Sequence, residues 1–152
     1  RLLGDIILTR QDLISSKQYK DGCVPLTWRI DVHIPNPWFT DRGKPGEGYT
    51  EDPFIAWAQP GDHSHYPTPY WMPFRCLYSR NVPNLFMAGR DISVSQDGLG
   101  AVRVMRTGGM MGEIVGMAAS ICKEHDCTPR DVYQRHLPKL KELMRQGAGR
   151  NK

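Results

Sequence analysis

Asn84-Leu-Phe-Met-Ala-Gly-Arg-Asp91, followed after a short loop by Leu99-Gly-Ala-Val-Arg-Val-Met-Arg-Thr-Gly-Gly-Met-Met-Gly-Glu-Ile-Val-Gly116, decides the fold of this 152-residue chain. The continuous apolar run 85–88 predicts a strand buried on both faces, which Gly89 ends. A long helix is expected from about Gly100 to His125. In open α/β sheets ligands lie at the carboxyl ends of strands, and the next helix presents unpaired N–H groups with partial positive charge. The pattern therefore predicts a site for an anion or an electron-rich ring oxygen.

The expected helix also carries a stripe of small residues. Gly108, Gly112 and Gly116 recur every four residues, and Ala119 and Ser120 continue the stripe. These positions share one face of a helix. Each interior glycine costs about 1 kcal/mol relative to alanine, so another backbone is expected to pass close to this face. We interpret the stripe as packing of helix on sheet and not as a ligand site.

Taken together, these motifs resemble the C-terminal, flavin-contacting segment of flavoproteins built on two dinucleotide-binding folds. The resemblance is greatest to bacterial FAD-dependent oxidoreductases related to the heterodisulfide reductase A flavoprotein, some of whose relatives are labelled xanthan lyase. The matching segments are 84–90, 92–93 and 99–107, with weaker support from 1–5, 30–33 and 73–77. The resemblance implies an α/β fold, or α+β for an isolated piece, with β-strands, a long glycine-rich helix and a C-terminal helix. It also implies FAD as cofactor.

Such flavoproteins begin with a Gly-x-Gly-x-x-Gly unit that holds the FAD pyrophosphate. Gly43-Lys-Pro-Gly-Glu-Gly48 is neither preceded by a strand pattern nor followed by a helix pattern, so it does not qualify. We therefore expect an N-terminal dinucleotide-binding half as a partner that precedes Arg1. The chain alone is expected to be inactive and to hold FAD weakly or not at all.

The resemblance implies a set of cofactor contacts. Gly89 would let the chain turn beneath the cofactor, and Asp91 would accept hydrogen bonds from ribityl hydroxyls. An ordinary strand-ending glycine and a turn-forming aspartate would look the same. Amide groups near Gly100 would face the flavin N1–C2=O edge, and Arg103 would either add positive charge there or form an ion pair with the missing half. The full set is Gly89, Arg90, Asp91, Leu99, Gly100, Ala101, Val102 and Arg103.

No residue stands out as catalytic. Candidates to face a substrate are His33, Tyr70, Arg75, Gln96 and Arg103, and each also has a plausible structural role. His63 and His65 are further candidates, but the sequence offers no third ligand at metal-site spacing, so no metal centre is expected. Relatives often carry histidine and alanine where this chain has Gln96 and Gly98. Glutamine cannot exchange a proton near neutral pH, so acid–base chemistry at that position is expected to be altered or relocated.

Three segments are expected. Residues 1–80 would belong to a substrate or cap domain, with strands near 6–9, 28–34 and 70–78 and a proline-, glycine- and aromatic-rich loop at 35–69. Residues 81–127 would form the strand–loop–helix unit of the FAD-binding domain. Residues 128–152 would form a basic helix and tail, capped by Thr128 with Asp131 and kinked or split by Pro138.

Charge and composition narrow the functional classes. The net charge is +4, of which +5 lies from Thr128 onward, and we interpret this as a solvated helix face and not as a nucleic-acid site. The most apolar stretch, 99–121, contains Arg103, Arg106 and Glu113, which argues against a membrane span. Four cysteines without paired spacing leave the compartment open between cytoplasm and periplasm. The substrate is expected to be a small molecule or carbohydrate-derived. The alternatives are a lyase-like carbohydrate-active protein and a non-catalytic packing module.

Overall fold

The chain folds into a mixed α+β structure, which confirms the fold class expected from the sequence. The computed structural model describes residues 2–35, 54–58 and 69–147. Its strands are β1 (Gly22–Leu26), β2 (Asp31–Pro35), β3 (Phe54–Ala58) and β4 (Tyr70–Pro73). Its helices are α1 (Arg10–Ile14), the 3-10 helix η1 (Phe74–Cys76), α3 (Gln96–Val102), α4 (Met105–His125), α5 (Pro129–Arg135) and α6 (Leu137–Gln146).

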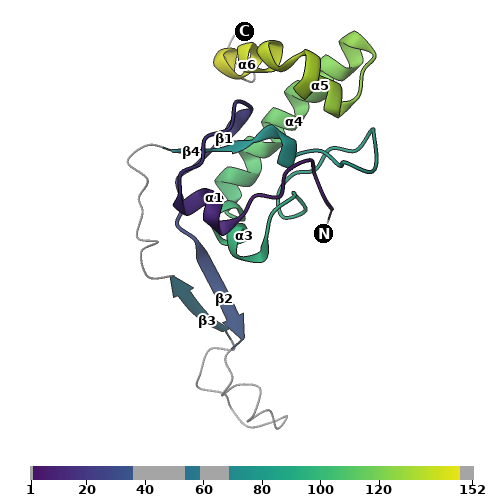
Figure 1. Cartoon of the computed structure of the whole chain (residues 1–152). Coiled ribbons are helices and arrows are strands. Elements are labelled where there is room, and N and C mark those ends of the chain that lie inside the picture. The colour runs from purple at the N-terminus through teal and green to yellow at the C-terminus, as the bar shows by residue number, and fades with distance from the viewer. Residues whose placement is uncertain (1, 36–53, 59–68, 148–152) are drawn as a thin grey trace.

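The strands form two separate antiparallel pairs, β1 with β4 and β2 with β3. The β1–β4 pair packs against α4, whereas the β2–β3 pair contacts α3 through β2 and extends away from α4 (Figure 1). Parallel pairing is limited, among the described residues, to one bridge between Leu8 and Val94. The chain therefore shows only a trace of a parallel α/β sheet.

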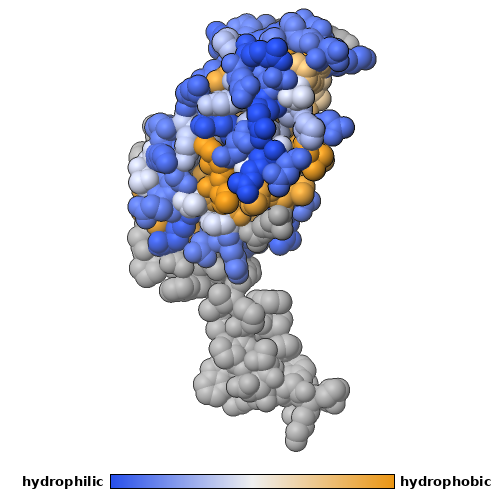
Figure 2. Space-filling model, turned by 45° about the vertical axis from the view of Figure 1, so that its right-hand side comes forward, coloured by the Kyte–Doolittle hydropathy of each residue, from blue (hydrophilic) through white to orange (hydrophobic). Residues whose placement is uncertain are grey.

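One hydrophobic core joins segments from the whole chain. Leu8, Phe74, Ile92, Met111 and Leu140 are all fully buried in it. The long helix α4 runs through the middle of the molecule, and α5 and α6 lie across its C-terminal end (Figure 1). Figure 2 shows hydrophilic side chains over that end and an apolar area below them. The core thus holds α4 in place against β1 and β4.

The capping signal expected at Thr128 is confirmed. Thr128 and Asp131 form a capping box at the start of α5, and Thr9 and Asp12 form another at the start of α1. Pro138 lies in the first turn of α6, where a proline needs no N–H partner. The expected split of the terminal helix therefore occurs at His136, between α5 and α6.

Several expected strands are shorter than the apolar patterns indicate. The run 85–88 makes a single antiparallel bridge, Tyr78 with Phe86, and the run 6–9 makes only the bridge at Leu8. The strand expected at 70–78 ends at Pro73, because the Phe74 N–H donates to the Asp21 carbonyl at 2.8 Å and the chain turns into η1. Tertiary hydrogen bonds override the local strand preference at these places.

Strand positions in the first half also differ from expectation. The strand expected at 28–34 begins only at Asp31, since Trp28 is 46% exposed and lies outside the pairing with β3. The sequence patterns do not predict β1 and β3, because Pro25 interrupts the first and the second lies in a proline-rich region. The rest of the expected loop, residues 36–53 and 59–68 with Gly43-Lys-Pro-Gly-Glu-Gly48, lies outside the described residues.

Candidate functional site

The long helix expected from Gly100 to His125 is instead two helices. Ser95 caps α3, its hydroxyl accepting the Gly98 N–H at 3.2 Å, so this helix begins at Gln96. It ends at Val102, and Val104 is extended before α4 begins at Met105. The expectation of a helix start at Gly100 is therefore wrong. Ser95 followed by an acidic residue in the first turn is the signal that locates it.

Residues 99–102 form the buried last turn of α3, where their amides belong to the hydrogen bonds of that helix. A Cβ added to Gly100 would lie 2.5 Å from the Asp31 carbonyl oxygen. The Arg103 guanidinium donates to the same carbonyl and to the Asp31 carboxylate, both at 3.2 Å. The close backbone approach anticipated at Gly100 is thus an approach to β2 of the same chain, and the partner of Arg103 is Asp31.

The N-terminus of α4 has the properties expected of the ligand site. No side chain caps it, and its first turn contains no acidic residue. Met105 is 95% exposed, and the neighbouring Arg106 is also exposed. The leading N–H groups of a 21-residue helix, with the positive end of its dipole, are therefore open to an anion or an electron-rich oxygen.

A glycine turn lies beside the first turns of this helix. Gly89 has φ +66°, a backbone conformation that favours glycine, and no heavy atom lies within 4 Å of the position a Cβ would take. Its N–H donates to the Met111 sulfur at 3.2 Å. Because Met111 lies six residues into α4, the turn is about 9 Å along the axis from the helix start. The adjacent Arg90 and Asp91 are exposed, so both side chains are free of the core.

Two of the candidate catalytic residues serve the fold. Tyr70 is only 2% exposed within β4, so its side chain is enclosed among the described residues, and a contact of Tyr70 with a substrate stays a prediction. Arg75 forms a two-pronged ion pair with the fully buried Asp21 carboxylate, at 2.9 and 2.8 Å. Its guanidinium also lies over the rings of Tyr133 and Tyr19. These contacts fix Arg75 in place, because a buried carboxylate must keep its partner.

The other candidates are less constrained. Gln96 is exposed in the first turn of α3, close along the chain to α4. Close packing favours a glycine at position 98, since a Cβ there would lie 3.0 Å from a Val94 side-chain carbon and 3.1 Å from the Leu8 carbonyl oxygen. His33 pairs with Ala56 in the β2–β3 ladder, and its side chain lies outside the described residues. His63 and His65 lie outside them as well.

The glycine stripe of α4 does not pack as expected. No heavy atom lies within 4 Å of a Cβ built at Gly108, Gly112 or Gly116, and the last two are exposed. The side of α4 that carries Met111 and Ala118 is buried instead. Within the part of the chain described by the structure, the partner backbone predicted for the stripe is thus not found.

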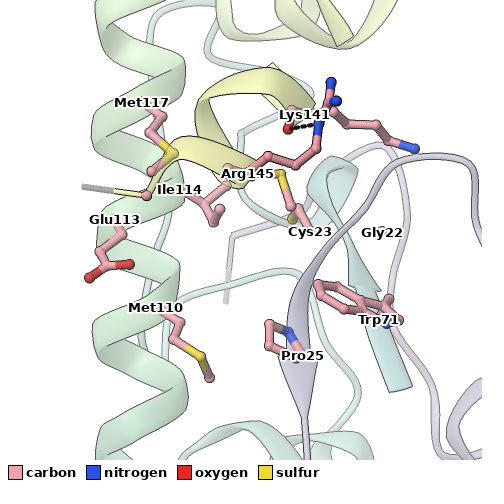
Figure 3. Close-up of a pocket in the computed structure, with 12 residues that line it drawn as sticks. Gly22, Cys23, Pro25, Trp71, Met110, Glu113, Ile114, Met117, Lys141 and Arg145 are labelled. Atoms are coloured by element: carbon pink, nitrogen blue, oxygen red, sulfur yellow. Dashed lines mark hydrogen bonds between the residues drawn. The ribbon is translucent and has the colours of Figure 1, made fainter. Parts of the chain in front are cut away.

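A cavity of about 600 Å³ lies on a side of α4 different from the glycine stripe. No sequence motif predicts this cavity. Figure 3 shows Met110 and Met117 of α4 facing Trp71 of β4, with Lys141 and Arg145 of α6 at the rim. It is separate from the Gly89 turn and from the start of α4. Among the described residues, no group of three or more His, Cys, Asp or Glu side chains could hold a metal ion.

Residues 1–144 match the family model described as FAD dependent oxidoreductase. The chain belongs to this family. The family assignment makes the chain part of a flavoprotein oxidoreductase and gives FAD as the cofactor class. No curated protein and no solved structure matches the chain. None of the described helices is long and apolar enough to cross a membrane.

The arrangement around α4 fits an FAD-dependent oxidoreductase. Reduction of a flavin places negative charge on its ring, which uncapped N–H groups and nearby arginines stabilise. The start of α4 offers these N–H groups without a competing carboxylate in its first turn. The open space at Gly89 lets a ligand approach the backbone closely. The free N–H groups of α4 and the open space at Gly89 therefore fit FAD as the cofactor class.

Proposed function

We propose that this FAD-dependent oxidoreductase holds the flavin between the Gly89–Asp91 turn and the start of α4, from its N-cap Val104 to Thr107. The uncapped α4 N-terminus is the observation that carries the proposal. An uncapped helix end with nearby arginines suits the electron-rich N1–C2=O edge of a flavin.

Bound FAD supplies the hydride or electron transfer chemistry. The N–H groups of Met105 and Arg106 would then stabilise negative charge at the ring edge, with the Arg106 side chain adding positive charge. Asp91 would accept hydrogen bonds from ribityl hydroxyls, and the neighbouring Arg90 would contact the cofactor from the same turn. Leu99, Gly100, Ala101, Val102 and Arg103 would act indirectly, because they hold α3 and β2 against the site.

We further propose that the open glycine face of α4 packs on a dinucleotide-binding part of the protein that carries a Gly-x-Gly-x-x-Gly unit. Gly112 and Gly116 are exposed on the side of α4 away from the core. A helix without side chains on that face allows another backbone to approach closely, which would offset the helix propensity lost at each glycine.

The substrate proposed is a small molecule or a carbohydrate derivative, and the subfamily proposed is the one related to heterodisulfide reductase A. The motif at 84–90 and 99–107 supports this subfamily. The substrate would approach near Gln96, which is exposed beside the α3–α4 junction. Because glutamine does not titrate near neutral pH, another group must handle any proton transfer there.

Val104 offers a direct test of the flavin contact, because it occupies the N-cap position of α4 without capping it. Val104→Asp would cap the helix and place a carboxylate where the flavin edge is proposed. A cap of this kind stabilises a helix by about 1 kcal/mol, while the added charge is expected to weaken FAD binding about tenfold or more. Flavin absorbance and FAD titration of the full protein, together with its thermal unfolding, measure both effects.

Val104→Asn is the matched control, because it caps the same N–H groups without adding charge. It is expected to weaken FAD binding less than Val104→Asp does. If both variants bind FAD as tightly as the wild type, the α4 N-terminus is not the flavin contact. A full wild-type protein that retains no FAD under any condition would also end the proposal.

A further inference from the structure

Two cysteines meet at the C-terminal end of α4. The helix ends at His125, and Asp126 adopts the left-handed conformation, with φ 46° and ψ 56°. The Cys127 N–H then donates to the Cys122 carbonyl at 3.1 Å. A left-handed residue followed by a bond that spans five residues is the Schellman motif, which commonly closes helices.

The Schellman motif brings together the side chains of the two residues that share this bond. In many Schellman motifs these side chains are apolar, but here both are thiols. Burial and the close Cys127 thiol together raise the pKa of Cys122 to about 11. Both cysteines are free and half-buried, whereas Cys23 and Cys76 are fully enclosed in the core. The pair at the end of α4 thus combines proximity with access for a reagent.

We propose that Cys122 and Cys127 form a redox-active dithiol that closes reversibly to a disulfide, with a low-molecular-weight disulfide as the oxidant. One cysteine thiolate attacks the oxidant, forms a mixed disulfide and releases one small thiol. The second cysteine loses its proton, attacks the mixed disulfide at the protein sulfur and releases the other small thiol. Two protein thiols and one small disulfide therefore become one protein disulfide and two small thiols.

The backbone is arranged for this bond. A disulfide needs two Cα atoms about 4.4–6.8 Å apart. The hydrogen bond from the Cys127 N–H to the Cys122 carbonyl holds the backbones of these two residues close together. The closed bond would fasten the end of α4 to Thr128, the N-cap of α5. Cys122 lies about 26 Å along α4 from its start, so the pair does not exchange electrons directly with a group bound there. The proposal is therefore independent of where the flavin binds.

Exchange with glutathione tests the proposal in the full protein. Wild type is incubated with mixtures of reduced and oxidised glutathione, quenched with acid and mapped by peptide mass spectrometry. The expected product is a Cys122–Cys127 disulfide, which reduced glutathione reopens. Cys122→Ser and Cys127→Ser are expected to stop at the mixed disulfide, which should be at least about tenfold more abundant than in wild type, because the internal thiol has a high effective concentration.

The double variant Cys122→Ser with Ser120→Cys is the matched control. It keeps the number of thiols but moves one by two residues, to an exposed position on a different side of α4. It is expected to accumulate mixed disulfides at the introduced thiol and at Cys127 without an internal bond. Equal amounts of mixed disulfide in wild type and in this control would overturn the proposal, as would a wild-type pair that stays reduced while the Cys127→Ser variant reacts.

Discussion

The buried carboxylate of Asp21 shows what a single residue does in this fold. Its side chain is fully buried, and it accepts two hydrogen bonds from the Arg75 guanidinium and a third from the Arg75 N–H at 3.1 Å. Asp21→Asn is expected to lower the free energy of unfolding by about 3 kcal/mol, because it leaves the Arg75 charge half-buried without its partner. Urea denaturation of the chain measures this loss.

Asp31→Asn is the control for this prediction. Asp31 also pairs with an arginine, Arg103, but both side chains are partly exposed, 19% and 28%. Water screens such a pair, so the loss is expected to be about 1 kcal/mol or less. Equal losses in the two variants would show that burial does not set the strength of the Asp21 pair. A loss of activity when Asp21→Asn is made in the full protein, with unchanged stability, would instead return Arg75 to the candidate substrate-facing residues.

These residues also show what single positions in the sequence can reveal. The sequence predicts a turn at Gly89, and the positive φ there confirms that the turn needs a glycine. Arg75 and Tyr70 look available for chemistry in the sequence, yet one pairs with a residue 54 positions away and the other lies in the core. Partners so distant in sequence leave no local pattern, so their roles could not be predicted without the structure.

At the scale of elements, local signals predict helix starts better than strands. The two capping boxes need only residues three positions apart, and the one expected at Thr128 and Asp131 forms. The break between α3 and α4 follows no proline, and it lies beside the contact of Gly100 and Arg103 with Asp31. The short apolar runs 6–9 and 85–88 do not form full strands, because another segment of the same chain pairs with each of them at one residue only.

The first capping box makes a prediction about acid stability. Burial raises the pKa of Asp12, but hydrogen bonds from Thr9, at 2.9 and 2.6 Å, and from Tyr19 outweigh it, so the pKa falls below its ordinary 3.8. A lowered pKa gives stability that is present above the unfolded value and is lost as pH falls through the folded value. The unfolding free energy of wild type is therefore expected to decline below about pH 5.

Urea denaturation of wild type and Asp12→Asn from pH 7 to pH 3 measures this contribution. The two proteins should differ most near neutral pH and converge as the pH falls, because protonation removes the charge that the substitution removes. Ser15→Ala, at the other end of α1, changes no carboxylate and should keep a constant difference from wild type. A difference between wild type and Asp12→Asn that grows towards pH 3 would contradict the assigned pKa direction.

At the scale of the whole molecule, the described residues bury one face of α4 and leave its glycine face uncovered. The sequence stripe correctly marks an unusual face, but its expected partner is not among the described residues. Spacing shows that a face has no side chains and cannot show which backbone covers it. The family match and the open glycines together favour the remainder of a flavoprotein as that partner.

Gly112→Leu separates the two environments of this face. In the 152-residue chain the leucine meets open space, and its helix propensity is expected to raise the free energy of unfolding by roughly 0.5–1 kcal/mol. In the full flavoprotein the same side chain would force the packed backbone apart, so FAD retention and the melting temperature should both fall. Gly100→Ala should instead destabilise both proteins by about 2 kcal/mol, because its Cβ would collide with Asp31 within the chain. Full FAD retention and an unchanged melting temperature in the full-length Gly112→Leu variant would mean that the glycine face is not covered by the rest of the protein.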